Sequence, residues 1–344
     1  LLTGTGSDLE LHTFKLTDQL SGRMMGVRAD ITPQVARIDA HKLRRETPTR
    51  LCYMGSVLRT HAMHFGGTRN PLQVGAELFG HDGVASDVEV LQLMLETIRV
   101  AGVKQLHVDL GHVGVYRGLA RQAGLELRQE MALFEALQRK AIPEIEALIA
   151  GFGINAAHAA MLNALAHLSG DEEVLQEARV RLAQASPEVH EALDYLQQVA
   201  EQAQRRVPEL SIHYDLAELR AYHYQTGIVF AAFTAGSGTE IARGGRYNDI
   251  GSAFGRARAA TGFSAYLKVL VRVAEQPGEQ QGEKILAPWS EDPALLSLVD
   301  ALRGQGKCVI WELPGQQGGA QQMQCSSVIR RTAREWVVEG LEEA

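Results

Sequence analysis

The sequence predicts an α+β protein, and three observations carry that prediction. Residues 51–59 and 72–79 alternate apolar and polar side chains as half-buried strands do, and Gly66 and Gly67 supply a turn between them. Residues 129–206 are instead rich in Ala, Leu, Glu and Gln and follow a helical period. Residues 276–283, QPGEQQGE, have the composition of a linker. At 344 residues the chain can bury a large core and divide into about two or three folding units.

Residues 1–128 are predicted to form the first part of a sheet domain. In chain order, the pattern favours strands at 13–16 and 27–30, a helix near 33–45, the two strands above, a helix near 86–101 and a strand at 105–110. Ser86 is the expected N-cap of the second helix, because Glu89 follows at capping-box spacing.

The second half of the chain is predicted to complete the sheet and add a small module. Residues 129–206 read as an inserted helical subdomain, after which residues 207–275 return to the first sheet. The returning strands are expected at 210–215 and 227–233. In residues 276–344 the pattern favours a strand at 284–288, a helix near 293–304, a strand at 307–313 and a last strand near 335–338. This order indicates a small C-terminal α/β module after the linker.

Composition excludes several classes of protein. The chain carries 34 basic and 41 acidic residues, a formal charge of −7, which gives no support to a nucleic-acid partner. Cys52, Cys308 and Cys325 are widely spaced, which argues against a disulfide framework or a structural metal and favours a reducing compartment. No run of about eighteen strongly apolar residues and no secretory pattern occurs. We therefore predict a cytoplasmic protein without a membrane span.

Two segments favour a small-molecule site. Gly244 and Gly245 are expected to form a turn that brings backbone close to a ligand, while Arg246 and Tyr247 add a cation and an amphipathic ring. Such a motif alone is more often a plain turn.

The second segment is the strand at residues 72–79. Its alternation places Gln73, Gly75 and Glu77 on one face, with Leu72, Val74, Ala76 and Leu78 on the other. The polar face therefore has side chains suited to hold a ligand.

These segments resemble class II aminoacyl-tRNA synthetases, and histidyl-tRNA synthetases in particular. The strand, loop and strand of residues 51–79 are similar to the second class II motif, with Arg59 at the position of its ATP-phosphate arginine and Arg69 at its loop arginine. Residues 28–37, RADITPQVAR, resemble the arginine-proline-glutamate-x-threonine segment that opens the same pocket. The resemblance implies an antiparallel sheet flanked by helices, with a C-terminal module like a reduced anticodon-binding domain.

The resemblance also implies a histidine pocket. Binding free histidine requires groups that neutralise an ammonium, match both imidazole nitrogens and enclose the ring. The positions that do so in the family hold Asp30, Thr32, Gln73, Glu77, Arg220 and Tyr224 in this chain. Residues 244–247, GGRY, are expected to form the framework of the pocket. Ordinary explanations stay open: a strand glutamate is usually solvated, an aspartate before a helix is usually a cap, and Arg220 suits a structural ion pair.

Departures from the synthetase pattern argue against catalysis. Lys268 and Val269 stand where active enzymes hold an acid and the arginine that clamps the nucleotide. His223 and Gln225 replace an aspartate and a second tyrosine. Losing a preorganised cation from a phosphoryl site typically costs a few kcal/mol of transition-state stabilisation. We therefore expect no amino-acid activation, no catalytic residue and no cofactor.

With these departures the chain is more similar to the regulatory subunits of ATP phosphoribosyltransferase, which are non-catalytic paralogs of the synthetase. That resemblance implies a protein of histidine biosynthesis that assembles with a short-form catalytic subunit, relays feedback inhibition by L-histidine and forms a self-dimer. It leaves open whether histidine binds in the synthetase-like pocket or at the subunit boundary. A divergent histidyl-tRNA synthetase using Arg59, Arg69 and Arg220 is the alternative, and another ligase or a translation regulator is a third.

Overall fold

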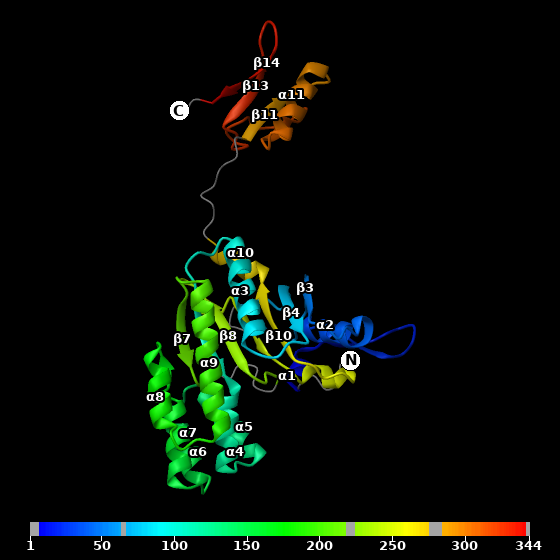
Figure 1. Cartoon of the computed structure of the whole chain (residues 1–344). Helices are drawn as coiled ribbons and strands as arrows, with labels where there is room; N and C mark the ends of the chain where they lie inside the picture. Colours follow the sequence, from blue (N-terminus) through cyan, green and yellow to red (C-terminus); the bar gives the residue numbers. More distant parts are fainter. Residues whose placement is uncertain (1–6, 63–66, 218–223, 275–283, 342–344) are drawn as a thin grey trace. The chain divides into compact units, whose positions relative to one another are not determined.

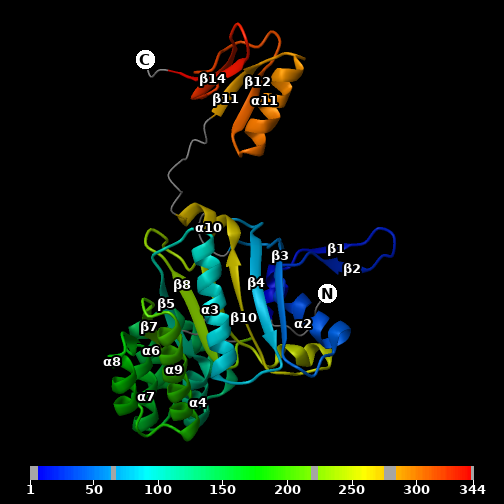
Figure 2. The same cartoon turned by 45° about the horizontal axis from the view of Figure 1, so that its top comes forward.

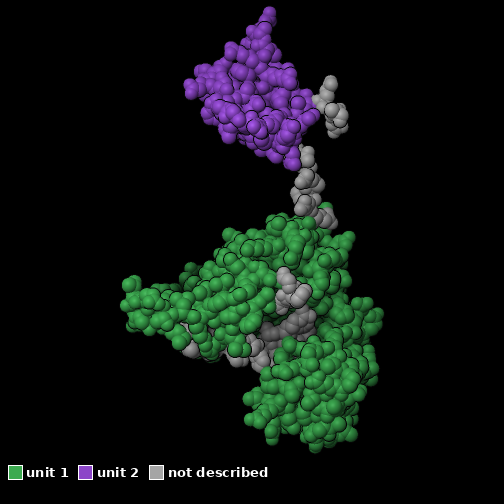
Figure 3. Space-filling model, turned by 180° about the vertical axis from the view of Figure 1, so that it is seen from behind, with its two compact units in different colours: residues 1–274 green, residues 275–344 purple. Residues whose placement is uncertain are grey.

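The computed structural model describes residues 7–62, 67–217, 224–274 and 284–341. The chain divides into two compact units, Leu1–Ala274 and Glu275–Ala344 (Figures 1 and 3). The segment predicted as a linker, residues 276–283, lies outside the described residues.

The first unit is built on an eight-stranded sheet. Its strand order is β3 (Thr49–Ser56), β4 (Leu72–Phe79), β10 (Ala260–Tyr266), β9 (Ala242–Arg246), β8 (Ile228–Phe233), β5 (His107–His112), β7 (Ser211–Asp215) and β6 (Ser169–Gly170). Neighbouring strands run antiparallel except β5 and β7, which are parallel. The prediction of an antiparallel sheet flanked by helices is therefore confirmed.

Three details of the predicted strands are wrong. Residues 27–30 do not form a strand, because the preceding strand ends at Gly26. The strand expected to reach Arg59 ends at Ser56, and Arg59 instead forms an isolated bridge with Thr13. Gly244 and Gly245 do not form a turn, because both lie within β9 and pair with β8 and β10. Glycine is uncommon inside strands, which is why the pattern favoured a turn at this point.

One face of the sheet carries the main hydrophobic core. Figures 1 and 2 show α3 (Val84–Val100) and α9 (Pro187–Arg206) covering this face. From the strands, Leu78, Phe230 and Leu110 are almost fully buried in a cluster shared with the helices. Burying each such side chain is worth about 1.5–3 kcal/mol, so this face fixes the register of the sheet.

A layer of helices extends the same core. It consists of α4 (Val113–Ala123), α5 (Leu127–Gln138), α6 (Ile142–Gly151), α7 (Ala156–Leu165), α8 (Glu173–Arg181) and α9. Glu126 and Gln129 form a capping box at the start of α5, and the side chain of Asn155 caps α7. Leu133, Leu165 and Leu193 belong to the cluster that includes the sheet residues. The helical layer and the sheet therefore share one hydrophobic core.

The opposite face of the sheet is covered at one end by a shorter helix. α2 (Thr32–Ile38), with Pro33 in its first turn, continues into the π-helical turn η1 (Asp39–Leu43). The helix predicted to reach residue 45 therefore stops at Arg44, whose φ of 48° is left-handed. With the 3-10 helix η2 (Ile250–Phe254), α2 buries Ile31 and Val35. This packing fixes the start of α2 close to the sheet.

Four further elements of the first unit are two short helices and two short strands. Helix α1 (Ser7–His12) precedes a hairpin of β1 (Lys15–Thr17) and β2 (Met24–Gly26), all of whose strand residues are exposed. Helix α10 (Leu267–Val273) follows β10 directly. None of the helices in the described ranges is long and apolar enough to span a membrane.

The second unit is a four-stranded sheet with one helix. β11 (Lys284–Pro288) lies between β12 (Cys308–Glu312) and β13 (Ser327–Arg331), parallel to both, and β14 (Trp336–Gly340) pairs antiparallel with β13. Helix α11 (Pro293–Gly304) begins at an N-cap bond from Ala294 N to Asp292. The sequence predicted this α/β module but not β13.

Candidate functional site

The predicted pocket residues of β4 lie on the sheet face opposite α3. Across the β4–β10 pair, Glu77 is opposite Gly262 and Gly75 is opposite Ser264. Gln73 and Glu77 are 0% and 2% exposed, so neither is the solvated strand residue that the ordinary explanation predicts. A buried polar face of this kind needs internal hydrogen bonds or a ligand.

Three hydroxyl groups surround the carboxyl group of Glu77. Thr32 donates to its Oε1 at 2.9 Å, the Tyr53 hydroxyl lies 3.1 Å from the same oxygen, and Tyr247 donates to its Oε2. Burial nevertheless raises the pKa of Glu77 to about 8, because the loss of solvation outweighs these donors. Glu77 is therefore mostly uncharged at pH 7 in the protein without ligand.

Asp30 and Gln73 form a second polar group beside Glu77. Asp30 Oδ1 accepts hydrogen bonds from Gln73 Nε2 at 2.9 Å and from the backbone N–H of Thr32 at 3.0 Å. Gln73 also accepts from the backbone N–H of Ile31 at 3.1 Å and donates to Ser264 Oγ at 2.7 Å. Asp30 is not the N-cap of α2, which is Ile31, but it bonds to the first residue of the helix and also contacts the strand. These bonds tie the start of α2 to β4 and β10.

Aromatic rings border the polar groups. Tyr224 stacks on Tyr247, with ring centroids 5.1 Å apart and planes inclined by 17°. Burial and the nearby Glu77 raise the pKa of both tyrosines well above the ordinary value, so their hydroxyls stay protonated. Arg220 and His223, two further residues of this segment that the sequence singled out, lie outside the described residues.

Glycines leave the room for these side chains on the sheet. A Cβ at Gly262 would collide with Glu77 Oε2, and one at Gly75 would lie 2.5 Å from the Tyr53 hydroxyl. Gly245 has a φ of 152°, and a Cβ there would lie 2.8 Å from Gln225 Oε1. The three glycines therefore form a floor without side chains, over which polar groups from other elements extend.

Arg246 anchors the sheet to α3. It is 4% exposed and forms two bonds to the carboxylate of Asp87, at 3.0 and 3.1 Å. It also donates to Ser86 Oγ at 2.8 Å. Ser86 is therefore not the predicted N-cap, because α3 begins at Val84 and the Ser86 hydroxyl is used to hold a cation from β9. Arg246 therefore joins β9 to the start of α3.

The cations that a synthetase would turn toward ATP contact protein groups instead. Arg59 is 6% exposed and donates to Ala29 O and to the Tyr266 hydroxyl, both at 3.0 Å. Arg69 donates to Arg59 O at 3.1 Å and lies over the ring of Phe14, 5.0 Å from its centroid.

The residues that replace the nucleotide clamp lie on α10. Lys268 Nζ donates to Asn70 O at 3.0 Å, and Val269 packs against the main core. Neither side chain supplies a guanidinium to a triphosphate. The arrangement therefore keeps the polar cluster on β4 but not the complete set of nucleotide-binding cations.

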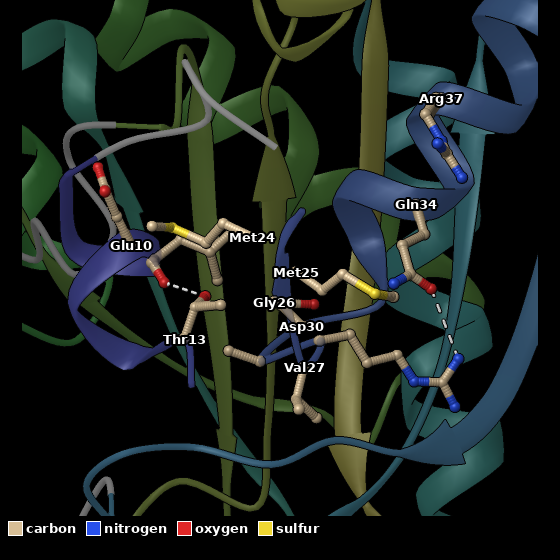
Figure 4. Close-up of a pocket in the computed structure, with 12 residues that line it drawn as sticks. Glu10, Thr13, Met24, Met25, Gly26, Val27, Asp30, Gln34 and Arg37 are labelled. Carbon is tan, nitrogen blue, oxygen red and sulfur yellow. Dashed lines mark hydrogen bonds between the residues drawn. The ribbon is translucent and has the colours of Figure 1, made fainter. Parts of the chain in front are cut away.

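A cavity of about 400 Å³ borders the polar cluster and is shown in Figure 4. Its lining comes from α1, β2, the segment that leads into α2 and α2 itself, and includes Met24, Met25, Gln34 and Arg37. Asp30 is the predicted pocket residue that it reaches. Among the described residues, no group of three or more His, Cys, Asp or Glu side chains could hold a metal ion.

The sequence did not identify several residues of this site. Tyr53 and Ser264, which are hydrogen-bonded to each other at 2.7 Å, connect the neighbourhoods of Glu77 and Gln73. Tyr247 was predicted as framework, yet its hydroxyl contacts Glu77. The alternation of β3 could have placed Tyr53 beside β4, but the pairing of β10 with β4 could not be derived from local pattern.

Comparison with known proteins gives the family. The family model described as histidyl-tRNA synthetase matches residues 1–270, and the model described as ATP phosphoribosyltransferase subunit HisZ C-terminal domain matches residues 282–339. A protein of Alkalilimnicola ehrlichii is 58% identical over 326 residues, which cover 94% of this chain and 81% of that protein. One of Thioalkalivibrio sulfidiphilus is 57% identical over 342 residues, covering 99% and 87%. Both are named ATP phosphoribosyltransferase regulatory subunit. The chain belongs to the family of ATP phosphoribosyltransferase regulatory subunits.

Solved structures with a similar fold include proteins described by the same function. A Bacillus halodurans protein, described as an ATP phosphoribosyltransferase regulatory subunit/histidyl-tRNA synthetase, superposes with a TM-score of 0.81 at 26% identity, covering 93% of this chain and 83% of that one. A chain of the ATP phosphoribosyl transferase (HisG:HisZ) complex from Thermotoga maritima has the same fold, with a TM-score of 0.57 at 20% identity, covering 73% and 84%. The chain is thus a non-catalytic regulatory subunit, and the synthetase alternative is set aside.

Proposed function

We propose that this regulatory subunit assembles with a short-form catalytic subunit of ATP phosphoribosyltransferase and holds the feedback effector L-histidine on the glycine floor of its sheet. The observation that carries the proposal is the cluster of Asp30, Gln73 and Glu77, polar side chains from β4 and from the segment before α2. Asp30 is partly buried, and Gln73 and Glu77 are almost completely buried. Their acceptor oxygens suit an ammonium group and a ring N–H.

In this proposal the ammonium group of histidine lies beside Asp30 and Glu77. A cation beside a buried carboxyl group favours its ionised form, so binding lowers the pKa of Glu77 from its raised value of about 8. Thr32 remains a donor to the carboxylate, and the stacked rings of Tyr224 and Tyr247 border the imidazole. Arg220, outside the described residues, completes the predicted set.

The arrangement of cations supports sensing without activation. Arg59 and Arg69 already contact backbone carbonyls, and the partly buried Val269 side chain packs against the core. A subunit that binds the end product of a pathway but does not adenylate it can act as its sensor. Coupling between such a site and a catalytic partner is typically worth about 1–3 kcal/mol, or roughly 5- to 150-fold in affinity. A self-dimer and a cytoplasmic location stay predictions of the sequence.

Reconstitution tests the proposal. The full chain is mixed with a short-form catalytic subunit, and phosphoribosyl transfer to ATP is measured against histidine concentration. We expect activity to depend on the chain and to fall as histidine is added. In a complex carrying Glu77→Gln, we expect the inhibitory histidine concentration to rise about tenfold or more, because a buried charge-assisted bond is lost.

Glu89→Gln is the matched control. Glu89 pairs with Arg50 on the surface, so this variant makes the same chemical change away from the cluster and should leave inhibition unchanged. Equal inhibition of the wild-type and Glu77→Gln complexes would place the effector elsewhere, for example at the boundary between subunits.

A further inference from the structure

Gln225 has a buried hydrogen-bonding atom without a partner. Its side chain is 5% exposed, and its Oε1 accepts no hydrogen bond from any part of the chain that the structure describes. A buried carbonyl oxygen that lacks a donor costs free energy, and such groups are rare in folded proteins. The sequence marked Gln225 only as a departure from the synthetase pattern, and no role in the site was predicted for it.

The orphan oxygen lies over the same floor as Glu77. A Cβ at Gly245 would lie 2.8 Å from Gln225 Oε1, and one at Gly262 would meet Glu77 Oε2. Gly245 and Gly262 are paired residues of β9 and β10, so positions above them are neighbours on one sheet face. The polar ends of Gln225 and Glu77 therefore extend over adjacent parts of the floor.

The surroundings of this oxygen favour a flat ring as its donor. Tyr224, the residue before Gln225, stacks on Tyr247, and Tyr247 donates to Glu77. The rings of Tyr224 and Tyr247 therefore lie near the glycine floor over which the polar ends of Gln225 and Glu77 extend. A neutral imidazole carries one N–H donor, which can satisfy the unpaired oxygen of Gln225.

We propose that Gln225 Oε1 accepts the ring N–H of the bound amino acid, so that Gln225 selects heteroaromatic amino acids that carry a ring N–H. This inference rests on the proposed histidine site and adds the residue that recognises the ring. A site that leaves an acceptor unpaired when the N–H is missing rejects isosteric rings more strongly than a purely apolar pocket does.

Calorimetry on the full chain tests the inference with two ligands of similar shape. L-Histidine carries a ring N–H, and 3-(4-thiazolyl)-L-alanine does not. We expect the wild-type chain to prefer histidine by at least about tenfold. In Gln225→Met, which keeps the volume and removes the acceptor, histidine affinity should fall about tenfold while thiazolylalanine affinity stays the same.

The ligand-free melting temperature separates recognition from a structural role. Gln225→Met removes an unpaired buried oxygen, so we expect its melting temperature to equal or exceed that of the wild type. A residue with a purely structural role would lose stability and affinity together. Asn163→Leu is the control, because Asn163 also has a buried, unpartnered carboxamide oxygen but lies in α7. Asn163→Leu should change neither the affinity for histidine nor the affinity for thiazolylalanine.

Each result decides the question. Histidine binding with unchanged affinity and preference in Gln225→Met would overturn the inference and leave the proposed function intact. No histidine binding by the wild type would overturn both. If Gln225→Met does not fold, nuclear magnetic resonance of ring-¹⁵N-histidine on the wild type replaces it. An exchange-protected ring N–H is expected, and a ring N–H in fast exchange with water would contradict the inference.

Discussion

The hydroxyl of Tyr247 donates a hydrogen bond to the carboxyl group of Glu77, which joins the end of β9 to the middle of β4. The two strands are not neighbours, because β10 lies between them. Gly262 on β10 makes this bond possible, since any side chain there would occupy the space of the Glu77 carboxyl. The pair therefore connects the GGRY segment to the proposed histidine site.

Removing this donor should destabilise the chain. Tyr247→Phe leaves a buried carboxyl oxygen with one donor fewer, and we expect the free energy of unfolding to fall by about 1–3 kcal/mol. Urea denaturation measures the change. Tyr214→Phe is the control, because Tyr214 is also buried but has no hydroxyl hydrogen bond to another described residue. A loss in the control as large as in Tyr247→Phe would argue against a specific contribution of the pair.

The raised pKa of Glu77 predicts how stability depends on pH. The folded protein holds the Glu77 proton up to about pH 8, whereas the unfolded chain releases it near the ordinary value of 4.5. Between these values the native state binds more protons, so stability falls as pH rises, by at most about 1.4 kcal/mol per pH unit for this group. Glu77→Gln should flatten that slope in urea titrations. An unchanged slope would mean that Glu77 is ionised in the folded protein.

Histidine binding at pH 7 should release a proton. The carboxyl of Glu77 is mostly protonated in the free protein, and an ammonium group beside it favours the ionised form. Calorimetry in buffers with different ionisation enthalpies measures the number of protons, which we expect to approach one for the wild type and zero for Glu77→Gln. Equal proton release by both would assign the titration to another group.

The buried pair of Arg246 and Asp87 should contribute strongly to stability. Asp87→Asn removes the buried carboxylate and leaves the guanidinium with the exposed carboxylate of Asp82, 3.0 Å away, so we expect a loss of about 3 kcal/mol in the free energy of unfolding. The exposed pair of Arg50 and Glu89 is the comparison, where Glu89→Gln should cost at most about 1 kcal/mol. A similar loss in both variants would contradict the structural role of Arg246.

The local sequence pattern was sufficient to predict β4 and its polar face, the helical layer, and most strands and the helix of the second unit. It failed where the deciding contact came from far along the chain. Ser86 and Glu89 have capping-box spacing, yet Ser86 binds Arg246, a residue 160 positions later. β9 and β10 were missed as strands because glycines that lower strand propensity serve to make room for Glu77 and Gln225.

The candidate site was only partly predictable for the same reason. Gln73 and Glu77 follow from alternation along one strand, but their bonds to Thr32 and Ser264 depend on how three segments pack. The burial that raises the pKa of Glu77 also arises only in the packed structure. A resemblance to a family carries such information because the family shares the packing.

Histidine-dependent ATP–pyrophosphate exchange tests most directly the central claim that the chain keeps an amino-acid site without a working nucleotide site. With saturating histidine, ATP and magnesium, we predict no exchange above the rate without histidine, because Arg59 and Arg69 contact backbone carbonyls and Val269 supplies no cation. Robust exchange that depends on histidine would show that the chain activates the amino acid and would contradict the account.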